Sequence, residues 1–225
     1  MQRATHLFSP QQRQQIADAV TAAESQTSCE IVPVVATQSG RYDRAEDMVG
    51  LWLAVIAAIT VWLVFPRTAN EHGDWSGLSF DLGLVLLVVS IVAAFLIGAL
   101  AGSQIGWLRR LFTPRQQMQE EVNARARAIF FDQRIHHTSG ATGLLIYVSL
   151  YEHQAVVLGD QEILDKVGQS VLDQLCAQLT TALKQSSPTE ALQTVITEAG
   201  KHLSGPLPRA ADDVNELADA LVLLD

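Results

Sequence analysis

Two long apolar segments interrupt this chain and limit what it can fold into. Residues 49–65 contain one polar side chain, Thr60, and residues 82–105 contain no Asp, Glu, Lys, Arg or His. A helix rises about 1.5 Å per residue, so the second segment can cross the roughly 30 Å apolar layer of a bilayer, and the first can do so with its aromatic flanks. We therefore predict two transmembrane helices that return the chain to the side it left.

The segments outside this hairpin have the pattern of one α/β domain. A strand-like run at 29–36 precedes the first span, whereas the runs at 143–150, 154–159 and 220–224 follow the second. A lone strand would leave its backbone donors and acceptors unpaired, so the early strand is expected to join the later ones. We predict a split domain over 1–45 and 113–225, with the transmembrane hairpin over 46–112.

Helix and strand signals define the predicted architecture. Ser9, Thr113 and Ser187 each precede a proline and lie three residues before Gln or Glu, the pattern of a capped helix start. Apolar spacing predicts one continuous helix over 162–184 and another that stops at Gly205. Pro33 inside the first strand indicates an edge strand or a bulge. The expected fold class is α/β, a mixed β-sheet flanked by helices in an αβα sandwich.

The cations around the spans predict their orientation. The intervening loop, 66–81, has one basic residue, Arg67, whereas five arginines lie on the outer flanks: Arg41, Arg44, Arg109, Arg110 and Arg115. Cytoplasmic segments carry the excess of Lys and Arg, so both termini and the α/β domain are expected in the cytoplasm. Residues 1–10 lack the apolar core of a signal peptide. We expect a multi-pass protein of the cell inner membrane.

Charge and cysteine content exclude other classes of protein. The net charge is −9, and the chain has no Lys/Arg stripe to neutralise phosphates, which argues against nucleic-acid binding. Cys29 and Cys176 have no Cys or His at metal-ligand spacing and are expected as buried thiols. Neither span contains an ionisable residue, which argues against a transporter.

The second span carries a stripe of small residues at intervals of four: Ala94, Gly98, Gly102 and Gly106. Such a stripe lets helix backbones approach closely. The first span offers Ala54 and Ala58 at the same spacing, so the two spans are expected to pack against each other. Homodimerisation and docking to another membrane protein are the alternatives.

Three stretches resemble the TPM-domain family, in its bacterial membrane-embedded branch. They are TSCEIV at 27–32, TGLLIYVSL at 142–150 followed by VVLGD at 156–160, and NELAD at 215–219. The chain departs from the family's usual pattern at four positions: Cys29, Pro33, His153 and Ala218. The resemblance implies the split α/β fold. It also implies one of three roles that family members have: phosphatase, binder of calcium or other divalent ions, or assembly factor for membrane complexes. Bacterial members are often associated with LemA-type membrane proteins, which are therefore an expected partner class.

A separate search for chemistry gives only candidate cation ligands. Asp160 follows a strand directly, Asp43 follows the first strand, and Asp212 and Asp213 precede the last, where they are placed to offer oxygens to Ca²⁺ or Mg²⁺. Asp160 is equally well placed as a helix cap. No calcium loop, phosphate-binding glycine loop or nucleophile elbow occurs.

Two functions from different classes follow from these patterns. The first is a non-catalytic interaction or assembly module tethered to the membrane, which the small-residue stripe and the lack of a catalytic motif favour. The alternative is a membrane-anchored, metal-dependent phosphatase, whose catalytic residues the sequence does not identify.

Overall fold

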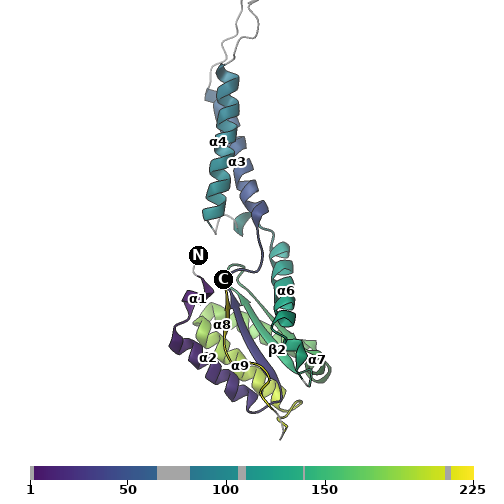
Figure 1. The fold of residues 1–225 in the computed structure, drawn as a ribbon. Coiled ribbons are helices and arrows are strands. Elements are labelled where there is room, and N and C mark those ends of the chain that lie inside the picture. The colour runs from purple at the N-terminus through teal and green to yellow at the C-terminus, as the bar shows by residue number, and fades with distance from the viewer. Residues whose placement is uncertain (1–2, 65–81, 106–109, 139, 211–213) are drawn as a thin grey trace, which may run out of the picture. The chain divides into compact units, whose positions relative to one another are not determined.

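The computed structural model describes residues 3–64, 82–105, 110–138, 140–210 and 214–225. The chain forms two compact units, one made of Met1–Gly40 with Gln116–Asp225 and the other of Arg41–Arg115. We call them the sheet unit and the helix-pair unit (Figure 1). These boundaries lie within five residues of the predicted ones, and the sheet unit contains residues from both sides of the inserted segment.

The sheet unit is built on a four-stranded mixed sheet with the order β3-β2-β1-β4. β1 (Glu30–Ala36) runs parallel to both β2 (Gly143–Ser149) and β4 (Val222–Leu224), and β3 (Gln154–Gly159) pairs antiparallel with β2. Ile31 lies opposite Leu144, and Val34 lies opposite Tyr147. The early strand therefore pairs with strands that follow the apolar segments, and β2 and β3 form an antiparallel hairpin.

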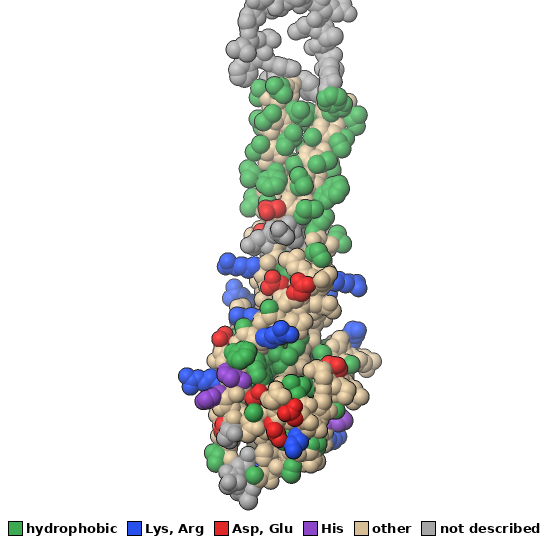
Figure 2. All heavy atoms as spheres, turned by 90° about the vertical axis from the view of Figure 1, so that its right-hand side faces the viewer, with side chains coloured by type: hydrophobic (Ala, Val, Ile, Leu, Met, Phe, Trp, Pro, Cys, Tyr) green, Lys and Arg blue, Asp and Glu red, His purple; other side chains and the backbone are tan. Residues whose placement is uncertain are grey.

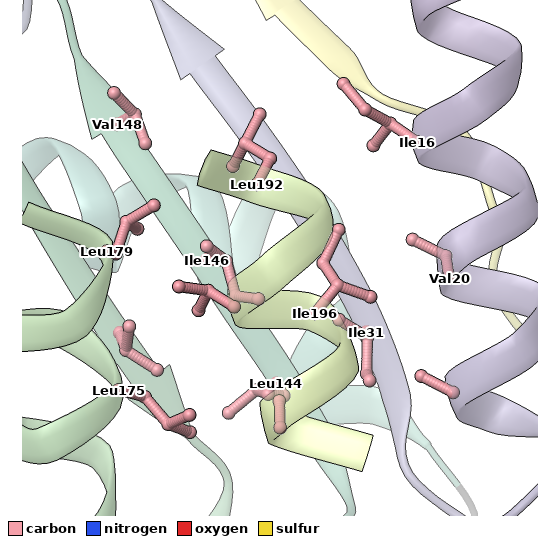
Figure 3. Packing of buried hydrophobic residues seen from close by; sticks show 14 of the residues in the cluster. Ile16, Val20, Ile31, Leu144, Ile146, Val148, Leu175, Leu179, Leu192 and Ile196 are labelled. Carbon is pink, nitrogen blue, oxygen red and sulfur yellow. The ribbon is translucent and has the colours of Figure 1, made fainter. Parts of the chain in front are cut away.

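Helices cover both faces of this sheet. α2 (Pro10–Glu24), α7 (Gln161–Val167), α8 (Gln169–Gln185) and α9 (Pro188–Ser204) bury their apolar residues against one face, and the short α1 (Ala4–Leu7) joins that core. Figure 3 shows residues of α2, α8 and α9 in this core. α6 (Arg115–Asp132) and the 3₁₀ turn η1 (Ile135–His137) cover the other face. Every residue of β1 and β2 is buried, as expected of strands that lie between two layers.

Local sequence explains where the helices begin. Ser9 and Ser187 each accept a bond from the backbone of the third helical residue, whose Gln or Glu side chain bonds back, so two of the three predicted capping boxes are confirmed. The third, at Thr113, precedes α6, which begins at Arg115. The predicted continuous helix over 162–184 is wrong, because Gly168 divides it into α7 and α8. Gly168 has φ +76°, a left-handed conformation that favours glycine and ends the first helix.

Pro33 was predicted to mark an edge strand or a bulge, but it lies in an inner strand whose pairing with β2 is uninterrupted. Along β1 the backbone N–H and C=O groups point alternately toward β2 and toward β4. Those of the even-numbered residues bond toward β2, so those of Ile31, Pro33 and Val35 face the side of β4. β4 pairs only from Val34 onward. The missing amide of Pro33 therefore falls where β4 has not yet begun, and the sheet loses no bond there.

The helix-pair unit contains α3 (Asp43–Val64) and α4 (Leu82–Gln104). Gly98 lies against Gly50, and Gly102 lies against Glu46, so the two helices run antiparallel. Each has a stretch long and apolar enough to cross a membrane, Glu46–Val64 and Gly83–Gln104, of which 17% and 6% are buried. Figure 2 shows hydrophobic side chains over the visible face of both helices and charged side chains over that of the sheet unit.

Candidate functional site

A buried carboxyl group, Glu152, organises the end of the sheet at which β1 and β2 finish. Glu152 lies in the turn after β2, and 2% of its surface is exposed. Its Oε1 accepts the backbone N–H groups of Ser39 at 2.9 Å and Gly40 at 3.4 Å, and its Oε2 accepts the hydroxyl of Ser149. Burying a carboxyl group costs free energy unless such donors surround it.

Three hydroxyl groups form a chain that ends on this carboxyl group. Ser149 donates to Glu152, and Ser39 Oγ donates to Ser149 Oγ at 2.8 Å. A hydroxyl has one proton, so Tyr147 must be the donor in its 2.8 Å contact with Ser39. Burial raises the pKa of Tyr147 above 10.0, so its hydroxyl keeps the proton that this donation needs. We call Ser39, Gly40, Tyr147, Ser149 and Glu152 the Glu152 cluster.

The register of the sheet brings these residues together. Tyr147 and Ser149 lie two apart on β2, so their side chains share the face that α6 covers. Ala36, the last residue of β1, lies opposite Ser149, and Ser39 follows three residues later. The carboxyl ends of parallel strands meet at one edge, so a residue just past β1 can reach the end of β2.

The cluster holds the chain where it leaves the sheet unit. Ser39 and Gly40 are the last residues before the helix-pair unit begins at Arg41. A Cβ on Gly40 would lie 2.8 Å from Cγ of Glu121, which belongs to α6, the helix that follows the insertion. Only glycine fits there without moving the Glu121 side chain. The segment that leaves the sheet unit and the helix that returns to it therefore touch.

Catalysis by this cluster is unfavourable because its reactive groups are enclosed. Ser149 is 1% exposed and Tyr147 is fully buried. Both oxygens of Glu152 already accept hydrogen bonds, and the proton of each hydroxyl is committed to a neighbour. The arrangement is therefore a structural clamp.

Three acidic residues, Glu24, Glu30 and Asp219, form another cluster at the opposite end of β1. Oε1 of Glu24 accepts the N–H of Ile31 at 2.8 Å, and Glu30 accepts those of Glu216 and Leu217 at 3.1 and 3.2 Å. Burial, together with the charges of Asp219 and Glu30, raises the pKa of Glu24 from 4.5 to about 8. The N–H of Ile31 lies on the side of β1 where β4 has not yet begun, and the Glu24 carboxyl group is its hydrogen-bond acceptor.

The predicted cation ligands are not brought together in the described part of the chain. Asp160 caps α7, where it accepts the N–H of Gln161 at 2.8 Å, and its other oxygen, Oδ2, is buried with no hydrogen-bond partner among the described residues. Asp43 is the first residue of α3, in the other unit, and Asp212 and Asp213 lie outside the described residues. Among the described residues no three His, Cys, Asp or Glu side chains form a metal-binding group. A Ca²⁺ or Mg²⁺ site stays a prediction.

The small-residue stripe lies partly at the contact between α3 and α4. A Cβ on Gly98 would lie 2.7 Å from Cα of Gly50, and one on Gly102 would lie 3.1 Å from Cα of Glu46. Ala94 is half-buried, and Gly106 lies outside the described residues. Because the atoms opposite Gly98 and Gly102 are backbone atoms, larger residues there would force the helices apart.

The Glu152 cluster was not singled out from the sequence. Neither Glu152 nor Ser39 is among the candidate residues that the sequence analysis predicts. One signal was available: Tyr147 and Ser149 place two polar groups at alternate positions of an otherwise apolar strand. Polar groups buried on one face of a strand need nearby partners, and Glu152 lies in the turn that follows.

Comparison with known proteins establishes a likeness of fold alone. No family model and no curated protein matches the chain. Among solved structures it is similar to the NMR structure of the BA42 protein from the psychrophilic bacterium Bizionia argentinensis. The two are 18% identical with a TM-score of 0.56, over 96% of this chain and 94% of that one.

Proposed function

We propose that this chain is a membrane-anchored, non-catalytic interaction module of the TPM type. One observation carries the proposal: α3 and α4 pack together through glycine while their apolar side chains point outward. Leu63, Val64, Ile97 and Leu100 are each more than 60% exposed. Exposed apolar surface of this extent is unfavourable in water and favourable in the apolar layer of a bilayer.

The Glu152 cluster lies where the chain leaves the sheet unit for the proposed anchor. The insertion leaves that unit at Gly40 and returns at Gln116, and Gly40 lies against Glu121 of α6, whose buried residues pack on the sheet. A force applied to a partner bound on the sheet unit would reach the anchor through the backbone of Ser39 and Gly40. A rigid clamp at this junction suits a scaffold for a membrane complex, with a LemA-type or other membrane protein as the proposed partner class.

The proposed location is the cell inner membrane, with both termini and the sheet unit in the cytoplasm. The arginine asymmetry around the two apolar segments supports this orientation. The test is cysteine-accessibility labelling in intact cells, with Cys29 and Cys176 replaced by Ala and single cysteines introduced at Asn70, Gln2 or Lys201. The Asn70 probe should react with an impermeant reagent from outside, and the other two should not. External labelling of either terminal probe would reverse the orientation.

A further inference from the structure

The sheet unit contains a cavity of about 240 Å³ that the proposed function does not use. It lies between the end of β2, the start of β3 and the last turns of α8, and Ser149 of the Glu152 cluster is also among its lining residues. Its lining includes the apolar residues Val148, Ala155 and Leu183 and the polar residues His153, Gln154 and Lys184. An apolar cavity of about 150 Å³ is enough to bind benzene, so this one can hold a small organic molecule.

The apolar residues that line the cavity favour an apolar ligand. Val148 belongs to the buried core between the sheet and α8, and Ala155 and Leu183 pack against that core. Ligand pockets for drug-sized molecules begin at about 300 Å³, so the volume here favours a smaller molecule.

The polar lining favours a negative charge on that molecule. Lys184 lies in the last turn of α8 and makes no ion pair with any described residue. By contrast, Lys166 is 3.7 Å from Glu162, and Lys201 is 2.8 Å from Glu198. In a chain with a net charge of −9, an uncompensated cation beside an apolar cavity is an attractive point for an anion.

The turn between β2 and β3 fixes the polar side of the cavity. His153 has φ +54°, a left-handed conformation that is uncommon for residues other than glycine. The turn follows directly on Glu152, whose carboxyl group is held by the Glu152 cluster. The position of Gln154 at the start of β3 is fixed by its pairing with Ser149. The cavity is therefore bounded by backbone that is held from both sides.

We infer that this cavity binds a small aliphatic carboxylate. Its hydrocarbon chain lies against Val148, Ala155 and Leu183, and its carboxylate lies beside Lys184. The inference is independent of the proposed membrane function, because every lining residue belongs to the sheet unit.

The test is titration of the full chain, in lipid nanodiscs, with hexanoate. Methyl NMR of Val148 and Leu183 should show saturable shifts, whereas acetate, which lacks the apolar body, should produce none. The neutral analogue hexanamide should bind about three- to fivefold more weakly, because it cannot pair with the exposed Lys184.

Matched substitutions distinguish this site from general surface binding. Lys184→Met keeps the apolar stem, removes the charge and should weaken hexanoate binding about fivefold, whereas Lys166→Met, at an exposed lysine elsewhere, should not. Ala155→Leu should abolish the methyl shifts by filling the cavity. Absence of shifts in the unmodified chain, equal affinity for hexanoate and hexanamide, or an unchanged affinity in Lys184→Met would each overturn the inference.

Discussion

The sheet unit and the helix-pair unit place their apolar residues in opposite ways. In the sheet unit the large aliphatic side chains lie inside, and the described charged residues, apart from Glu30 and Glu152, are exposed or half-buried. In the helix-pair unit glycine lies inside, at Gly50, Gly98 and Gly102, and the large aliphatic side chains lie outside. The first arrangement suits water, and the second suits a hydrocarbon solvent. This contrast supports our proposal that the two units are built for two different solvents.

Removing the buried carboxyl group should have the largest effect within the sheet unit. Glu152→Ala leaves the N–H groups of Ser39 and Gly40 and the hydroxyl of Ser149 without their acceptor. We expect a loss of about 3 kcal/mol in the free energy of unfolding, measured with urea. Glu162→Ala, which removes an exposed carboxylate, should cost about 0.5 kcal/mol or less. Equal losses in the two variants would contradict the clamp.

A larger residue at the helix contact should weaken the other unit. In Gly98→Leu the new side chain meets the backbone of Gly50, so α3 and α4 must separate. We expect a loss of about 1–2 kcal/mol in helix association, followed by thermal denaturation in detergent micelles. Ala93→Leu adds the same side chain at an exposed position of α4 and is the control. If the two variants denature alike, Gly98 does not determine the packing.

The acidic cluster at the start of β1 should make the sheet unit sensitive to pH. The folded state raises the pKa of Glu24 from 4.5 to about 8, so it binds the proton more tightly than the unfolded chain does. The contribution of Glu24 to the free energy of unfolding is fully present below pH 4.5 and is lost as the pH rises toward 8. After allowance for the partial exposure of Glu24, we expect a decline of about 1–2 kcal/mol between pH 5 and pH 8. Urea unfolding across this range should show a smaller decline in Glu24→Gln.

A second substitution sharpens this prediction. Asp219→Asn removes one of the charges that raise the pKa of Glu24. The NMR titration of Glu24 should then move to lower pH in this variant. A wild-type midpoint near 4.5 would contradict the assignment.

The smallest effect is expected at Asp160. Its Oδ1 caps α7, and the amide oxygen of Asp160→Asn can accept the same bond. The midpoint of thermal unfolding should therefore change by less than about 1 °C without added metal. Millimolar Ca²⁺ that raises the midpoint of the parent chain but not of the variant would instead support a cation site and the phosphatase alternative.

Patterns that repeat along the chain predicted most of the fold. Local sequence was enough to predict the apolar segments, the strand runs and the capping boxes at Ser9 and Ser187, because each depends on neighbours within a few residues. The break at Gly168 was missed because an apolar stripe continues across it, although one glycine with positive φ is enough to divide a helix. Pro33 was misplaced because the sequence does not give the length of β4.

The clamp could not be predicted for a different reason. Ser39 and Glu152 are 113 residues apart, and only the register of β1 with β2 brings them together. The candidate ligand Asp160 was recognised by its position after a strand, which is equally typical of a helix cap. A short-range signal of this kind does not distinguish a metal ligand from a cap.

The contrast between the two units is tested most directly by alkaline carbonate extraction of cell membranes. The full chain should stay in the membrane pellet. A variant in which residues 41–115 are replaced by a short Gly/Ser linker should appear in the supernatant, with a cooperative thermal transition measured by circular dichroism after purification. Release of the full chain into the supernatant would contradict the membrane anchor and with it the account of two units for two solvents.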